Sequence, residues 1–185
     1  MKVIGNSLPR YNYNFGISAD WYGIDFSVLF QGIGKQNWYP GAETSMFWGP
    51  YSRPYASFIP SDFMSQVWSE ENTDAYFPRP RGYVALGSNR ELAVVNTKYL
   101  QNLAYCRLKN LSIGYTLPDK WLSKIGFEKI RVYFSGENLL TFTKLHSDYI
   151  DPEQASAENS IQSANGNAKL YPWSKTYSFG VNVTF

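Results

Sequence analysis

The sequence predicts an all-β fold, in which antiparallel up-and-down strands form part of the wall of an outer-membrane β-barrel. Three observations support this fold class: strands in which apolar and polar residues alternate, connections that alternate between short and long, and an aromatic content of 18%. Alternation with period two gives each strand one apolar and one polar face, as a wall between lipid and an aqueous interior requires. Five strands are too few to close a barrel, so we expect a segment of a wall.

The most regular strand is predicted at 173–185. From Lys175 onward its even positions are small or polar, whereas the odd positions after the lysine are apolar. In a barrel the apolar set faces lipid, and a terminal aromatic residue resembles the signal that the barrel-assembly machinery reads. We therefore expect an assembly role for Tyr177, Phe179, Val181, Val183 and Phe185. This strand should also present an unpaired edge, because the first strand of the barrel is missing here.

Four earlier strands are predicted from the same alternation, at 11–20, 24–31, 103–117 and 128–140. The first two are joined by a tight turn that ends at Gly23. The alternation disappears over two long loops, 32–102 and 141–172, in which short helices are expected, one of them at 61–70. Loops of this length are uncommon in compact soluble domains but typical of the extracellular side of barrels.

Two basic residues of the third strand, Arg107 and Lys109, fall on its apolar side. A charge on the lipid face costs about 2–4 kcal/mol at the membrane midplane and much less near the interface. We therefore expect both residues at the outer rim, where long side chains reach water. The end of the strand near Tyr115 should lie deeper.

Composition excludes several classes of protein and site. A net charge of +2 without a run of Lys or Arg does not favour a nucleic-acid partner. One Cys and one His provide neither an internal disulfide nor a zinc site, and no apolar run is long enough for a transmembrane helix. Asp151 and Glu153 flank Pro152 in a polar loop without an acid/base partner, so we expect no enzyme and no cofactor.

Aromatic residues of the first long loop are the candidate ligand-binding residues. Sugar rings stack on such side chains, which makes Trp38, Tyr39, Trp48, Tyr51 and Trp68 candidates for contact with cargo. Phe47 and Tyr55 belong to the same group. The alternative is that these rings pack the loop against itself or against a partner. Polar residues expected to face the interior, where they line the lumen or hold a plug, are Arg131, Glu137 and Asn138.

Several stretches together resemble a known family, among them VIGNSLPRYNYNFGIS (3–18) and WSEENTDAYFPRP (68–80). The most specific combination is RLKNLSIGYTLP (107–118), SGENLL (135–140) and YPWSKTYSFGVNVTF (171–185). These are similar to the C-terminal end of SusC/RagA-type, TonB-linked outer-membrane transporters. The resemblance implies that residues 1–185 are the C-terminal segment of a 22-stranded barrel, without the plug domain.

The resemblance also implies a function and partners. It implies import of oligosaccharides or peptides together with a SusD-like surface lipoprotein, energised by TonB through an N-terminal part that this sequence lacks. Such a protein lies in the cell outer membrane in contact with lipid, and this segment alone is not expected to transport. The alternative is a soluble all-β glycan-binding module at the cell surface, which would use the same aromatic residues without a membrane.

Overall fold

The computed structural model describes residues 2–42, 44–52, 59–87, 90–123, 126–157 and 171–185. The chain forms two compact units. The sheet unit consists of Arg10–Gly34, Tyr105–Thr143 and Trp173–Phe185. The loop unit consists of Met1–Pro9, Lys35–Ala104 and Lys144–Pro172. All long strands belong to the sheet unit, and the long connections belong to the loop unit.

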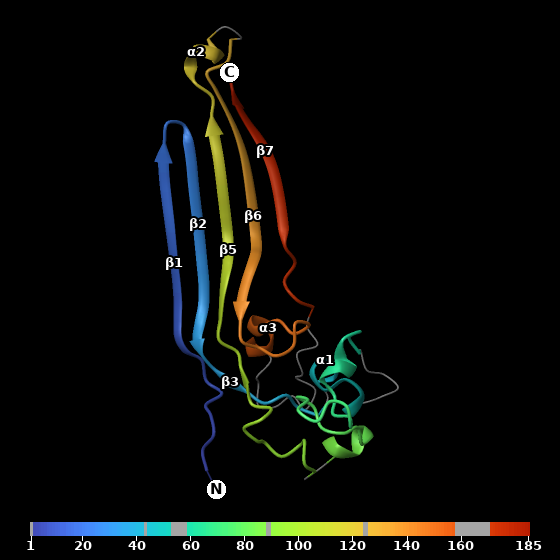
Figure 1. Cartoon of the computed structure of the whole chain (residues 1–185). Coiled ribbons are helices and arrows are strands. Elements are labelled where there is room, and N and C mark those ends of the chain that lie inside the picture. The colour runs from blue at the N-terminus through green and yellow to red at the C-terminus, as the bar shows by residue number, and fades with distance from the viewer. Residues whose placement is uncertain (1, 43, 53–58, 88–89, 124–125, 158–170) are drawn as a thin grey trace. The chain divides into compact units, whose positions relative to one another are not determined.

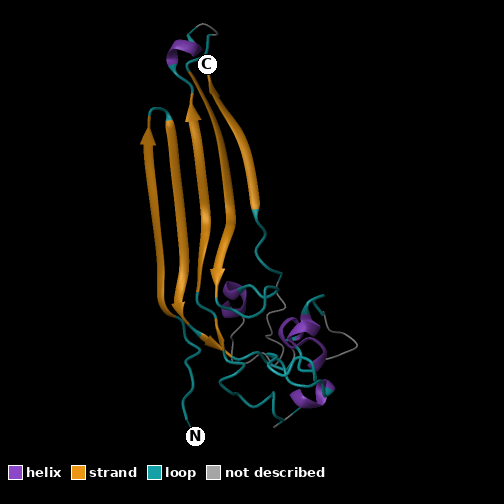
Figure 2. Cartoon of the chain, in the orientation of Figure 1, coloured by secondary structure: helices purple, strands orange, loops and turns teal. Residues whose placement is uncertain are grey.

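The sheet unit is one antiparallel sheet with the strand order β1-β2-β5-β6-β7 (Figures 1 and 2). Its strands are β1 (Arg10–Trp21), β2 (Ile24–Lys35), β5 (Tyr105–Thr116), β6 (Lys129–Thr143) and β7 (Thr176–Thr184). The predicted fold class, all-β with antiparallel up-and-down strands, is confirmed, and within the described residues the sheet is not closed. Compared with the predicted ranges, β2 and β6 extend further into the long connections, and β7 begins at Thr176 rather than at 173.

Short connections lie at one end of the sheet. Tyr22 and Gly23 join β1 to β2 with φ angles of 47° and 84°, the left-handed conformation that a two-residue type I′ turn needs at both central positions. The connection from β5 to β6 contains the helical turn α2 (Asp119–Leu122), which follows Pro118. The chain enters and leaves the sheet for the loop unit only at the opposite end, within the described strands.

The strand register aligns residues of like polarity across the sheet. One row consists of Ser27, Ser112, Ser135 and Ser178, which pair directly from β2 to β7. The adjacent row consists of Phe26, Ile113, Phe134 and Phe179. Because successive side chains of a strand point to opposite sides, the first row marks the polar face and the second the apolar face. Phe179 on the apolar face is 82% exposed.

A β-bulge in β5 changes the position predicted for Arg107. Asn110 pairs with Leu29, but Leu108 pairs with the next residue, Phe30, so Lys109 is an extra residue. The bulge reverses the alternation, because one inserted residue moves all later side chains to the other face. Arg107 consequently shares a row with polar residues, and its Nε donates a hydrogen bond to Thr141 Oγ1 at 2.9 Å. The expectation that Arg107 lies on the apolar side is wrong.

The loop unit has a hydrophobic core of its own. Its short elements are β3 (Asn37–Trp38), α1 (Ser45–Trp48), η1 (Gly49–Tyr51), η2 (Phe63–Gln66), η3 (Gly82–Leu86), β4 (Gln101–Asn102) and α3 (Pro152–Ala157). β3 and β4 pair with each other. The core includes Phe47, Phe77 and Leu103 from the first long connection and Leu145 and Ile150 from the second. In the described part of the chain, no helix is long and apolar enough to span a membrane.

Candidate functional site

Three of the five candidate ring residues lie inside the core of the loop unit. Trp48 is completely buried, and its Nε1 donates to the carbonyl oxygens of Pro40 at 3.1 Å and Gly41 at 3.0 Å. The buried Tyr51 hydroxyl donates to Pro78 O, and burial raises the pKa of Tyr51 above its ordinary value. Trp38 is buried in the same cluster. These rings stabilise the loop unit and present no free face to a ligand, which matches the packing alternative.

Tyr39 lies at the edge of this core. Its hydroxyl donates to Leu92 O at 2.7 Å and accepts a hydrogen bond from Asn96 Nδ2 at 2.9 Å. Burial raises the pKa of Tyr39 to about 12, which the hydrogen bond from Asn96 partly opposes. Both contacts fix the hydroxyl of this half-buried residue.

Trp68 is half-buried, as Tyr39 is, whereas the other three candidates are buried. The Arg79 guanidinium lies 5.9 Å from the centroid of its ring, within the range of a cation–π contact. The backbone N–H of Trp68 donates to Phe77 O at 3.0 Å, which ties the residue to the core. An accessible ring on a fixed backbone is suited to stacking against a sugar or an aromatic side chain.

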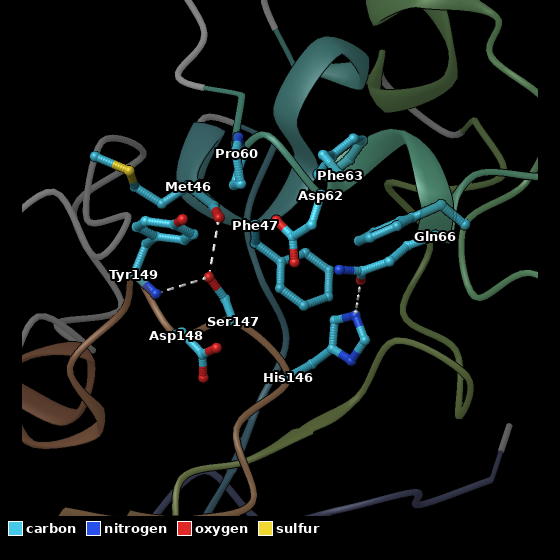
Figure 3. Close-up of a pocket in the computed structure, with 11 residues that line it drawn as sticks. Met46, Phe47, Pro60, Asp62, Phe63, Gln66, His146, Ser147, Asp148 and Tyr149 are labelled. Atoms are coloured by element: carbon cyan, nitrogen blue, oxygen red, sulfur yellow. Dashed lines mark hydrogen bonds between the residues drawn. The ribbon is translucent and has the colours of Figure 1, made fainter.

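A cavity of about 40 Å³ lies next to the core, with carboxylates and a histidine in its lining (Figure 3). It is lined by Met46, Phe47, Pro60, Asp62, Phe63, Gln66, Phe77, His146, Ser147, Asp148 and Tyr149. Ser147 Oγ fixes one side, since it donates to Met46 O at 3.1 Å and accepts from the Tyr149 N–H at 3.3 Å. One water molecule needs about 10–15 Å³ on this measure, so the cavity has room for a few water molecules.

His146 joins three parts of the loop unit. Its ring stacks on Tyr76 with 3.8 Å between centroids, and its Nε2 lies 2.8 Å from Gln66 Oε1. Its backbone N–H donates to Gln101 Oε1 at 3.2 Å. The residue as a whole is exposed, but burial of the ring lowers the pKa of His146 below 6.5, and the Asp148 carboxylate opposes this shift. His146 therefore acts as a neutral packing residue at pH 7.

The polar face of the sheet holds an ion pair that the sequence interpretation missed. Arg131 on β6 reaches across β5 to Asp25 on β2, with 2.7 Å from Nε to Oδ1 and 2.5 Å from Nη2 to Oδ2. The crossing passes over Gly114, where an added Cβ would lie 2.5 Å from the guanidinium. The sequence did contain a signal for this ion pair. Asp25 lies on the polar side of β2, and Arg131 lies on β6 near the same end of the sheet.

The other two candidates for the interior differ from each other. Glu137 is exposed in a row with Asn110 and Thr176 on the polar face. Asn138 lies in an irregular part of β6 and has a φ of 52°. Its Nδ2 is 3.4 Å from Ser174 O, and its Oδ1 has no hydrogen-bond partner among the described residues. Asn138 therefore has two roles: its backbone adopts the left-handed conformation of this irregular part of β6, and its side chain contacts Ser174.

The residues of the expected assembly signal lie along β7 and at the C-terminus. They are Tyr177, Phe179, Val181, Val183 and Phe185, and all of them are exposed in this sheet. Phe179 contacts Phe134 with 5.0 Å between ring centroids, and Phe185 contacts Phe127 at 5.4 Å. These contacts leave most of each ring free on the apolar face.

Of the two acidic residues considered for catalysis, Asp151 caps the helix α3 and Glu153 lies in its first turn. Asp151 Oδ1 accepts the N–H of Glu153 at 2.9 Å, and Pro152 occupies the first position of α3, as is common at a helix N-terminus. The described residues contain no group of three or more His, Cys, Asp or Glu side chains that could hold a metal ion. In the described residues, the candidate side chains take part in packing, ring stacking and strand pairing.

Comparison with known proteins extends over the whole chain. No family model matches it. TonB-dependent receptor P3 of Formosa agariphila is 33% identical over 190 residues, which cover 100% of this chain and 17% of the receptor. TonB-dependent receptor P26 of the same organism is 29% identical over 188 residues, which cover 99% of this chain and 18% of the receptor. The chain thus spans less than a fifth of the length of these relatives.

Solved structures of the RagAB peptide importer are similar in fold. The open-open and closed-closed states give TM-scores of 0.59 and 0.61 at 22% identity, and a further RagAB structure gives 0.65 at 23%. Each comparison covers 100% of this chain and 18% of the other chain. The sequence motifs, the antiparallel sheet and these similarities agree. This chain belongs to the TonB-dependent receptors and corresponds to a part of such a receptor.

Proposed function

We propose that this chain supplies part of the wall and the extracellular loops of a TonB-dependent transporter in the cell outer membrane. The two-faced sheet is the observation that carries this proposal. The row that contains Phe134 faces lipid, and the row that contains Ser135 faces the interior. The end of the sheet with the long connections is the extracellular end, because barrels have short periplasmic turns and longer outer loops.

In the proposed transporter, a SusD-like surface lipoprotein assists import and TonB supplies energy from the periplasm through another part of the receptor. The cargo is an oligosaccharide or a peptide. The RagAB structures are those of a peptide importer, which supports the peptide class, and the half-buried Trp68 ring suits either class. This chain alone does not transport, because the five-stranded sheet of the described residues leaves two unpaired edges.

Within the loop unit we assign contact with cargo or lipoprotein to Trp68, and to Tyr39 in a lesser role. Trp38, Trp48 and Tyr51 hold the unit together. The Trp68→Ala variant of the full-length receptor is expected to take up less labelled cargo or to co-purify with less lipoprotein.

Trp121→Ala is the matched control. Trp121 is also a tryptophan of a connection. It is more exposed than Trp68, at 61%, and it lies in α2, in the short connection from β5 to β6. Uptake and lipoprotein yield equal to wild type in Trp68→Ala would remove Trp68 from the site. A full-length protein that is monomeric and soluble without detergent would favour the glycan-binding module instead.

A further inference from the structure

Three side chains of the sheet unit lie across a neighbouring strand at a glycine. They are Tyr13 over Gly32, Arg131 over Gly114 and Tyr133 over Gly180. An added Cβ on any of these glycines would lie 2.5 Å from a terminal atom of the crossing side chain, too close for any real contact. At Gly32 the carbonyl oxygen of Tyr105 would lie closer still. A side chain at any of the three glycines would therefore have to displace its neighbours.

Two of these crossings end on a partner on the next strand beyond. Tyr13 starts on β1, passes over β2 and donates its hydroxyl hydrogen to Tyr105 O on β5 at 2.9 Å. Arg131 starts on β6, passes over β5 and reaches Asp25 on β2 at 2.7 Å. A crossing therefore joins strands that are not neighbours in the sheet.

The third crossing points beyond the described sheet. Tyr133 starts on β6 and lies over its direct partner Gly180 on β7, the outermost strand in the described part of the chain. Its hydroxyl oxygen and Cζ lie 2.5 and 2.4 Å from an added Cβ on Gly180. The corresponding values for Tyr13 at Gly32 are 2.5 and 2.6 Å. The two phenol groups thus lie at similar distances from the strand that they cross, although on opposite faces of the sheet: Gly32 is in the row of Cys106, on the apolar face, and Tyr133 is in the row of Asp25, on the polar face that Arg131 also crosses.

We propose that the Tyr133 hydroxyl donates a hydrogen bond to a backbone carbonyl of the strand that pairs with the free edge of β7 in the receptor wall. The partner is another strand of the same receptor, whose relatives continue far beyond this chain. Adjacent strands lie about 4.8 Å apart, so a carbonyl of that strand is within reach of a hydroxyl placed over β7. Arg131, 4.9 Å from the centre of the Tyr133 ring, holds the ring against the sheet. Tyr133 is a positioning residue for closure of the wall.

This inference rests on the proposed function, since it needs a wall that continues past β7. The direct test places the photoreactive residue p-benzoylphenylalanine at position 133 of the full-length receptor in outer membranes, with position 115 as the control. Tyr115 is on the apolar face, in the row of Ile24 and Val132. We expect a cross-link from position 133 to one peptide of the receptor itself, in a wall strand, and none from position 115 to that peptide.

A cross-link from position 133 to a plug, to a lipoprotein or to TonB would overturn the inference, as would the absence of any cross-link. Uptake of cargo by the unmodified receptor is measured separately. Loss of uptake there would contradict the proposed function, whereas uptake without the expected cross-link would contradict only the inference about Tyr133.

A second measurement covers the case in which the photoreactive variant does not fold. Tyr133→Phe removes the hydroxyl alone, and Gly180→Ala displaces the ring. Tyr133→Phe is expected to lower the ratio of folded to unfolded receptor in urea by about 2- to 12-fold, the factor for one neutral hydrogen bond, and Gly180→Ala by more. Tyr115→Phe is expected to have no effect. Equal ratios for Tyr133→Phe and Tyr115→Phe would refute the proposed contact.

Discussion

Replacing Leu111 by arginine tests which face of the sheet meets lipid. Leu111 is the seventh of the 12 residues of β5 and lies on the apolar face, in a row with Val28 and Gly136. At a rise of about 3.4 Å per residue it is roughly 20 Å from one end of the strand and 17 Å from the other, and so near the centre of an apolar band about 25 Å tall. An arginine at the midplane costs about 2–4 kcal/mol, which lowers the ratio of folded to unfolded receptor about 30- to 900-fold.

The matched control is Ser112→Arg, which places the same charge one residue further along, on the polar face. Both variants are made in the full-length receptor, and the folded fraction in outer membranes is measured by the change in gel mobility on heating. We expect a large loss of folded receptor for Leu111→Arg and a small one for Ser112→Arg. Equal losses, or a larger loss for Ser112→Arg, would refute the assignment of the two faces.

Three further predictions concern the loop unit and the bulge. Trp48→Ala should destabilise the loop unit by about 3–5 kcal/mol, because it empties a fully buried site, whereas Trp68→Ala should have little effect; cleavage of the loops by added protease on intact cells compares the two. Deleting Lys109 should remove the bulge and turn Arg107 to the apolar face, so less folded receptor is expected than for Lys109→Ala, which keeps the chain length; equal yields would contradict the role of the bulge. Burial lowers the folded pKa of His146 below 6.5, so its contribution to stability is present above that pH and is lost as the pH falls through the folded pKa. Protease cleavage of the loop unit should therefore increase between pH 7.5 and 5, and less so in His146→Gln.

The antiparallel sheet could be predicted because its signal is local. Each strand shows its two faces within a few residues, and no knowledge of the neighbouring strand is needed to find the alternation in β7 or in the first hairpin. The bulge at Lys109 has no such local signal. A reversal of faces is visible only when Leu108 is paired with Phe30 and Leu140, and pairing is a property of three strands together.

The interior of the loop unit was harder to predict, because its signal is not local. The aromatic residues of 32–102 were recognised as one group, but burial depends on contacts between distant parts of the chain, such as Phe47 with Phe77 at 5.6 Å and with His146 at 6.2 Å. An irregular backbone gives no periodic pattern from which the buried side of a ring can be read. Accessible Trp68 and buried Trp48 are therefore indistinguishable in sequence.

The core of the loop unit is formed by residues that precede β5 in the sequence and residues that follow β6. This imposes an order on its folding. Leu103 belongs to the first long connection, while Leu145, Ile150 and Ala155 follow β6. A chain that is synthesised from its N-terminus presents all the aromatic rings of this core before the residues after β6 exist. Until Ala155 has been synthesised, the rings of Phe47, Trp48 and Phe77 lack part of the cover that the complete core gives them, so this unit cannot finish packing before the chain beyond β6 is present.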